Sequence, residues 1–178
     1  MNSTANVIRL AIIFVLTLLL QVVIFDNLDF LGLCNPFIYV IFILLAPFGT
    51  PTWLLMFMAA AAGLVVDVSA NTPGMHTAAC ILIAYLRPFV LRLIAFRNTS
   101  YKEGDMPSSR SYGTLWFLRY TFIMVAIHHV ALFIIEQFDS FYLIPTLIRI
   151  VLSIIASTVL IVLLENFMPN SVSGAADD

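Results

Sequence analysis

The stretch "GLVVDVSANTPGMHTAACILIAYL", residues 63–86, predicts two apolar helices joined by a short polar turn. Asp67 lies near the end of the first apolar run, and His76 lies at the start of the second. Between them, "SANTPG" combines the residue types that favour turns, and Pro73 and Gly74 directly precede the second helix. The stretch therefore predicts a helical hairpin that carries an acid and an imidazole at one end.

Small side chains occupy one face of the first helix of this hairpin. Ala59, Gly63 and Asp67 are spaced four residues apart, so they share a face on which another helix can approach closely. We expect Asp67 to accept hydrogen bonds from the free backbone N–H groups that begin the second helix, or from His76. A carboxylate that faces a ligand is the alternative.

The composition places the chain in a membrane. Of its 178 residues, 62% are hydrophobic and only 10% are charged, whereas soluble domains carry about 25% charged residues. About 20 apolar residues cross a bilayer as a helix. We therefore predict an all-α integral membrane protein with a six-helix transmembrane bundle. The predicted spans are residues 7–25, 35–48, 52–68, 75–94, 114–136 and 142–164.

The second span, 35–48, is short, and a re-entrant segment there would leave five spans and opposite termini. The distribution of basic residues favours six. Six of the eight basic residues cluster around the connection 95–113, namely Arg87, Arg92, Arg97, Lys102, Arg110 and Arg119. This predicts that the connection and both termini are cytoplasmic. Asp26, Asp29, Asp67, Glu136 and Asp139 then bound the opposite side. The connection is polar and is expected to be mobile, and the tail 169–178 is expected to be disordered.

Arg149 is the deepest basic residue, about two turns inside the last span. Two interpretations stay open for it. It pairs with Glu136 or Asp139 as a structural clamp, or it extends to the headgroups or a partner protein.

His128 and His129 lie within the fifth span and are expected to hydrogen-bond between helices. We expect His76 and His128 at different depths, which disfavours a metal site. Cys34 and Cys80 are widely separated and are expected to be buried small hydrophobes. The chain contains no nucleotide-binding, zinc or nucleophile-elbow motif. We therefore predict no enzyme activity, no catalytic, metal or cofactor residue and no nucleic-acid partner.

The hairpin residues resemble a motif of the rod shape-determining protein MreD family. The resemblance is carried by Gly63-Leu64, Asp67, Pro73-Gly74, His76 and Ala84-Tyr85-Leu86, and by "LQVVIFDNLDFLG" followed by "NPF". It implies a non-enzymatic subunit of the bacterial elongation machinery in the cytoplasmic membrane. The implied partners are an MreC-type protein, MreB, a RodA-type glycosyltransferase with its transpeptidase, and membrane lipid.

The resemblance also implies a fold similar to the substrate-binding subunits of energy-coupling-factor vitamin transporters. This supplies the alternative function, a small-molecule-binding transport subunit. An outward-facing polar group at the mouth of the bundle, made by Asp67, Asn71 and His76, motivates that alternative. On either reading, the residues singled out as structural or partner-contact candidates are Ala59, Gly63, Asp67, Pro73, Gly74, His76 and Arg149.

Overall fold

The computed structural model describes residues 2–27, 34–95, 101–136 and 143–168, without the side chains of Asn2, Ser3, Leu143 and Pro145. Within these ranges every regular element is a helix, so the all-α prediction is confirmed. The elements are α1 (Asn2–Val23), the 3-10 helix η1 (Phe25–Asn27), α2 (Ile41–Leu45), α3 (Thr52–Ala70), α4 (Met75–Ile94), α5 (Ser109–Tyr112), α6 (Thr114–Glu136) and α7 (Leu143–Phe167).

In the described part of the chain, five helices are long and apolar enough to cross a membrane, over Thr4–Asn27, Thr52–Ala70, Met75–Ile94, Thr114–Glu136 and Thr146–Phe167. Proline and glycine set several of their boundaries, because they disfavour or cap helical backbone. Pro51 precedes α3, while Gly74 and Gly113, both with positive φ, precede α4 and α6. The bounds agree with five of the predicted spans to within a few residues. The predicted tail 169–178 lies outside the described residues.

The second predicted span, residues 35–48, is not a transmembrane helix among the described residues. We call residues 35–48 the central segment, and it is helical only at α2, with irregular backbone before it. Pro36 and Pro47 restrict the residues that precede them to extended backbone, and Ala46 has a ψ of 134°. A 14-residue helix would also reach only about 21 Å, whereas extended residues advance about 3.3 Å each. The partly extended chain therefore covers a distance that a helix of this length cannot.

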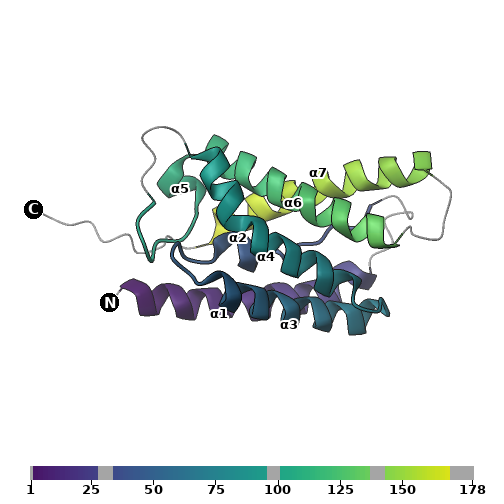
Figure 1. The fold of residues 1–178 in the computed structure, drawn as a ribbon, viewed down its shortest axis with the longest axis horizontal. Coiled ribbons are helices and arrows are strands. Elements are labelled where there is room, and N and C mark those ends of the chain that lie inside the picture. Colours follow the sequence, from purple (N-terminus) through teal and green to yellow (C-terminus); the bar gives the residue numbers. More distant parts are fainter. Residues whose placement is uncertain (1, 28–33, 96–100, 137–142, 169–178) are drawn as a thin grey trace, which may run out of the picture.

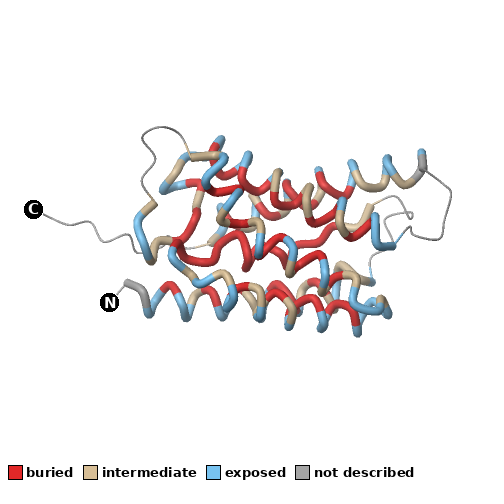
Figure 2. Tube along the Cα trace, in the orientation of Figure 1, coloured by how far each residue is buried: buried red, intermediate tan, exposed pale blue. Residues whose placement is uncertain are grey.

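The central segment forms the core of the bundle. Every residue from Ile38 to Ala46 is at most 2% exposed. In Figure 2 the buried trace runs through the middle of the bundle, while the outer faces of the surrounding helices are exposed. On α1 and α7 those exposed faces are apolar, as expected for helices in contact with lipid. They include Ile8, Ile12, Leu16, Leu147, Ile148 and Val151.

The two ends of the bundle differ in structure. We call one the turn end, where residues 71–74 connect α3 to α4, and the other the α5 end (Figure 1). The central segment runs between them, since the Asn35 N–H donates to Ser153 Oγ near the turn end, and Phe48 exchanges backbone hydrogen bonds with residues 104 and 105 at the α5 end. Among the described residues, the five long helices and this segment therefore run between the two ends of the bundle.

Both described chain ends consequently lie at the α5 end (Figure 1). The Asn6 amide donates to the Gly104 carbonyl at 2.8 Å, which attaches the start of α1 to the connection. The Ser109 hydroxyl donates to the Glu165 carboxylate at 2.6 Å, which attaches the end of α7.

The described part of the connection, residues 101–113, is packed against the bundle, in contrast to the mobile loop that its composition predicts. Tyr101 stacks on Phe48 with ring centroids 4.7 Å apart, and Tyr112 contacts both of these rings and Trp116. Local polarity misleads here because aromatic residues spaced along a polar stretch bury a continuous surface once the bundle is present. Residues 96–100 lie outside the described ranges.

Candidate functional site

Asp67 closes the α3–α4 hairpin at the turn end, and its side chain is buried. One carboxylate oxygen accepts from the His76 backbone N–H at 2.9 Å and from the Thr72 hydroxyl at 2.8 Å. The other accepts from the Thr77 N–H at 3.0 Å and from its hydroxyl at 2.6 Å. These N–H groups belong to the first turn of α4 and have no partner within the helix. The expected hydrogen bonds to backbone groups are therefore present, and the His76 imidazole does not take part.

Gly63 brings the two helices of the hairpin into backbone contact. A Cβ atom on Gly63 would lie 2.4 Å from Thr77 Cα and 2.6 Å from the Thr77 nitrogen, both backbone atoms that cannot move aside cheaply. Ala59, one turn earlier on the same face, is fully buried. The predicted small-residue face is thus the surface on which α3 meets α4, and the close approach at Gly63 places the start of α4 within reach of Asp67.

The turn between the helices depends on two left-handed residues. Asn71 ends α3 with a φ of 55°, and Gly74 precedes α4 with a φ of 80°. The Thr72 N–H donates to the Asp67 carbonyl at 2.9 Å, and the Gly74 N–H donates to the Thr72 carbonyl at 2.8 Å. A Cβ atom added to Gly74 would meet no other atom within 4 Å. Glycine is therefore favoured here by its positive φ and not by a lack of space. Pro73 is exposed between these residues.

Tyr39 of the central segment connects two histidines from different helices. Its hydroxyl oxygen lies 3.0 Å from His76 Nδ1 and 3.1 Å from His128 Nε2, and the Cys80 thiol donates to it at 3.3 Å. A hydroxyl has one hydrogen to donate, so one imidazole accepts from Tyr39 and the other donates to it. All four side chains are buried.

The prediction that His76 and His128 lie at different depths was wrong. Their ring centroids are 6.4 Å apart. Both rings lie within hydrogen-bond distance of the same Tyr39 hydroxyl. Among the described residues, no group of three histidine, cysteine, aspartate or glutamate side chains is arranged to hold a metal ion. The His128 Nδ1 atom is buried without a hydrogen-bond partner.

Side chains from α1 and α7 satisfy the irregular backbone of the central segment. The Gln21 carbonyl oxygen accepts from the Ile38 N–H at 2.9 Å. Ser153 and Ser157 on α7 accept from the N–H groups of residues 35 and 37, each at 2.9 Å. His129 Nε2 lies 3.1 Å from the Ser157 hydroxyl, so this histidine has the predicted interhelical contact. Backbone outside a helix is tolerated at this depth only with such partners.

At the other end of the central segment, Arg87 and Tyr120 bind its last carbonyl groups. The Tyr120 hydroxyl donates to the Leu44 carbonyl at 3.1 Å, and the Arg87 guanidinium donates to the Ala46 carbonyl and, at 3.0 Å, to Tyr120. Arg87 is only 4% exposed. A charged group buried this deeply is therefore a structural partner of the backbone.

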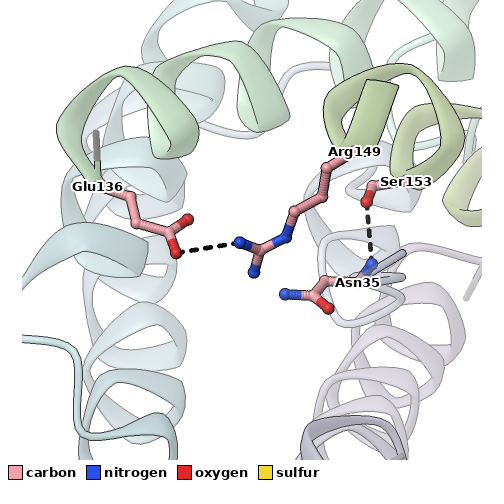
Figure 3. Close-up of polar contacts among 4 residues, drawn as sticks. All are labelled: Asn35, Glu136, Arg149 and Ser153. Carbon is pink, nitrogen blue, oxygen red and sulfur yellow. Dashed lines mark hydrogen bonds and ion pairs between the residues drawn. The ribbon is translucent and has the colours of Figure 1, made fainter. Parts of the chain in front are cut away.

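Arg149 pairs with Glu136, one of the two interpretations left open by the sequence. The guanidinium Nη1 lies 3.5 Å from the Glu136 carboxylate, and Figure 3 shows Arg149 reaching from α7 toward α6 with Asn35 beside it. When the Asn35 side-chain amide is oriented with its oxygen toward Arg149, this oxygen accepts a hydrogen bond from Nη2 at 2.6 Å. The guanidinium also lies 5.1 Å from the Phe133 ring. Asp139, the other predicted partner, lies outside the described residues.

A pocket of about 280 Å³ lies among these groups at the turn end. It brings together residues from η1, the central segment, the α3–α4 turn, α6 and α7. Its charged lining residues are Asp26, Glu136 and Arg149, and its polar and aromatic ones are Gln21, Phe25, Asn35, Phe37, Thr72 and His76. Of the sequence-predicted residues, His76 and Arg149 reach this pocket.

Several residues of the site were not predicted from sequence. Tyr39, Gln21, Ser153 and Ser157 were missed, because each acts on a segment far away in the chain. The available signal was their polarity within otherwise apolar stretches. Cys34 adjoins this region half-buried, and burial raises the pKa of its thiol, which favours the protonated form.

Searches of protein-family models, of curated proteins and of solved structures each found no match to this chain.

Proposed function

We propose that this chain is a non-enzymatic membrane scaffold subunit of the bacterial cell-elongation complex. In this role it binds an MreC-type partner and couples MreB filaments to peptidoglycan synthesis. The proposal rests on one observation. The residues that resemble the MreD motif, among them Gly63, Asp67, Gly74 and His76, build a single hairpin at the turn end.

The chemistry of this hairpin suits a rigid contact surface. A carboxylate has about four acceptor sites, and the four hydrogen bonds to Asp67 occupy that number. The carboxylate is therefore committed to holding the turn. The backbone contact at Gly63 also fixes the position of α3 relative to α4. A preorganised surface of this kind reduces the entropy lost when a partner binds.

The distribution of charge supports the orientation that the proposal requires. Arg9, Arg87, Arg92, Lys102, Arg110 and Arg119 lie toward the α5 end, together with both described chain ends. The positive-inside rule assigns that end to the cytoplasm. The turn end then faces the extracytoplasmic side, and MreB lies opposite it.

The proposal is tested by depletion and by co-purification. Depleting the protein in its own host should turn rod-shaped cells round, and the tagged protein should retain the MreC-type partner. A Gly63→Leu variant should lose both properties, while Ala61→Leu, on the exposed side of the same helix, should keep them. Normal shape and normal wall synthesis after deletion would show the scaffold assignment to be wrong.

The pocket at the turn end favours a second candidate, a small-molecule-binding subunit of an energy-coupling-factor type transporter. Its polar and aromatic lining and its position at one end of a helical bundle are the supporting observations. Native mass spectrometry of protein purified from its host should then reveal a tightly held metabolite. A ligand-free spectrum, together with the absence of neighbouring ATPase genes, would remove this candidate.

A further inference from the structure

The pocket at the turn end contains more negative than positive charge. Asp26 and Glu136 contribute two carboxylates, and Arg149 contributes one guanidinium. The Glu136 carboxylate is paired with Arg149. For Asp26, no cationic partner is present among the described residues. An isolated carboxylate at a membrane surface attracts positive charge.

The positive charge of Arg149 is already paired within the protein. Nη1 faces Glu136, Nη2 faces the Asn35 amide, and Nε is buried without a partner. Figure 3 shows the guanidinium directed at Glu136, with Asn35 beside it. The one cation of the pocket is thus engaged by groups of the protein itself. The lining therefore does not favour a ligand that carries a carboxylate or phosphate as its main recognition group.

Asp26, in contrast, keeps acceptor capacity. One oxygen accepts from the Gln21 amide at 2.8 Å, and the other accepts from the Ser69 hydroxyl at 3.1 Å. Donors from the described residues therefore fill only two of the roughly four acceptor sites of this carboxylate. Gln21 is only 1% exposed and also bonds the central segment through both ends of its amide. This buried amide holds the carboxylate in one position, so that no reorganisation is needed for binding.

We propose that this pocket binds an ammonium group, with Asp26 as its counter-ion. An ammonium ion donates up to three hydrogen bonds. Phe25 and Phe37 also line the pocket, and aromatic rings attract cations. At about 280 Å³ the pocket falls near the lower limit of small-molecule sites, about 300 Å³. The ligand is accordingly a small amine or the headgroup of a larger amphiphile.

Two sources supply this chemistry, a free amine and the ethanolamine headgroup of a phospholipid. The pocket lies where α3 and α6 end and α4 begins, which is the level of the headgroups for helices that span the bilayer. This inference does not depend on the scaffold proposal, since binding is measured on purified protein and the scaffold role is measured by cell shape. Failure of either therefore leaves the other intact.

The free-amine arm uses the full chain in nanodiscs of phosphatidylglycerol, a lipid without an amine. Ethanolammonium chloride is titrated by calorimetry, and sodium propionate serves as the anionic comparison. Ethanolammonium should bind and propionate should not. Asp26→Asn keeps the acceptor for Gln21 but removes the charge, and it should weaken binding at least tenfold.

The lipid arm uses native mass spectrometry of delipidated protein incubated with equal amounts of phosphatidylethanolamine and phosphatidylglycerol. Retention of phosphatidylethanolamine that is lost in Asp26→Asn identifies the lipid as the source. A signal in the calorimetric arm alone identifies a free amine. Either result supports the ammonium site.

Two further variants separate charge from folding. Ala70→Phe fills the pocket from its exposed edge without changing Asp26, and it should also abolish binding. Asp105→Asn makes the same chemical change at the α5 end and should leave binding unchanged. Binding that is equal in wild type and Asp26→Asn, a preference for propionate, or no binding in either arm would overturn the proposal.

Discussion

The α3–α4 hairpin and the central segment both bury polar groups, but their partners lie at very different distances along the chain. Asp67 bonds to groups no more than ten residues away. The N–H groups of residues 35 and 37 bond to serines 118 and 120 residues away. The hairpin is therefore specified locally, whereas the central segment takes up its conformation only within an assembled bundle.

The largest effect is expected for Gly63→Leu, which breaks the hairpin. Its side chain would overlap the α4 backbone, where a Cβ alone lies 2.4 Å from Thr77 Cα. Overpacking of cores typically costs about 1–3 kcal/mol, and a backbone clash should exceed the upper value. Thermal unfolding in micelles, followed by tryptophan fluorescence, measures the loss. Ala61→Leu is the control, and equal midpoints for the two variants would contradict the close approach.

Asp67 is expected to show the next largest effect. Asp67→Leu removes all four hydrogen bonds and should cost about 3 kcal/mol, since a buried donor left without a partner costs about 1–3 kcal/mol. Asp67→Asn keeps an acceptor and should cost about 1 kcal/mol. Equilibrium unfolding in mixed micelles gives both values. The same order should hold in a cell-shape complementation assay. Equal behaviour of the two variants would show that the hydrogen bonds to Asp67 do not hold the hairpin together.

Gln21→Leu tests the central segment. It leaves the Ile38 N–H buried without its partner, and we expect a loss of about 2 kcal/mol. Hydrogen exchange should accelerate in residues 36–46 while the start of α4 stays protected. Asn27→Leu removes an exposed amide from the same region of the chain and serves as the control. Uniform acceleration across both regions would show that the two are not independently specified.

Glu136→Gln should have the smallest effect. The Arg149 and Glu136 side chains are 29% and 35% exposed, and ion pairs of this kind contribute about 0–1 kcal/mol. The unfolding midpoint should change little, and its dependence on salt concentration should weaken. A decrease of more than about 2 kcal/mol in the free energy of unfolding would contradict this expectation, because only a buried ion pair is that costly to break.

The hairpin shows how far local reasoning extends in this protein. The spacing of Ala59, Gly63 and Asp67 predicted both the helix contact and the acceptor for the start of α4, because residues four apart share a helix face in any context. The pairing of Arg149 with Glu136 was one of two interpretations that the sequence left open. The neighbouring residues of Arg149 do not determine whether its side chain turns toward another helix or toward the headgroups. The position of His128 beside His76 was not predicted, because it depends on Tyr39 from a third element.

The sequence by itself determined the all-helical class, five apolar helices and the α3–α4 turn, since runs of hydrophobic residues and glycine or proline boundaries act through neighbouring residues. Only the tertiary structure decided the path of the central segment, the packing of residues 101–113 and the pocket at the turn end. Each of these is held by side chains from helices far away in the chain, and their hydrogen bonds and buried surface exist only after those helices have packed together.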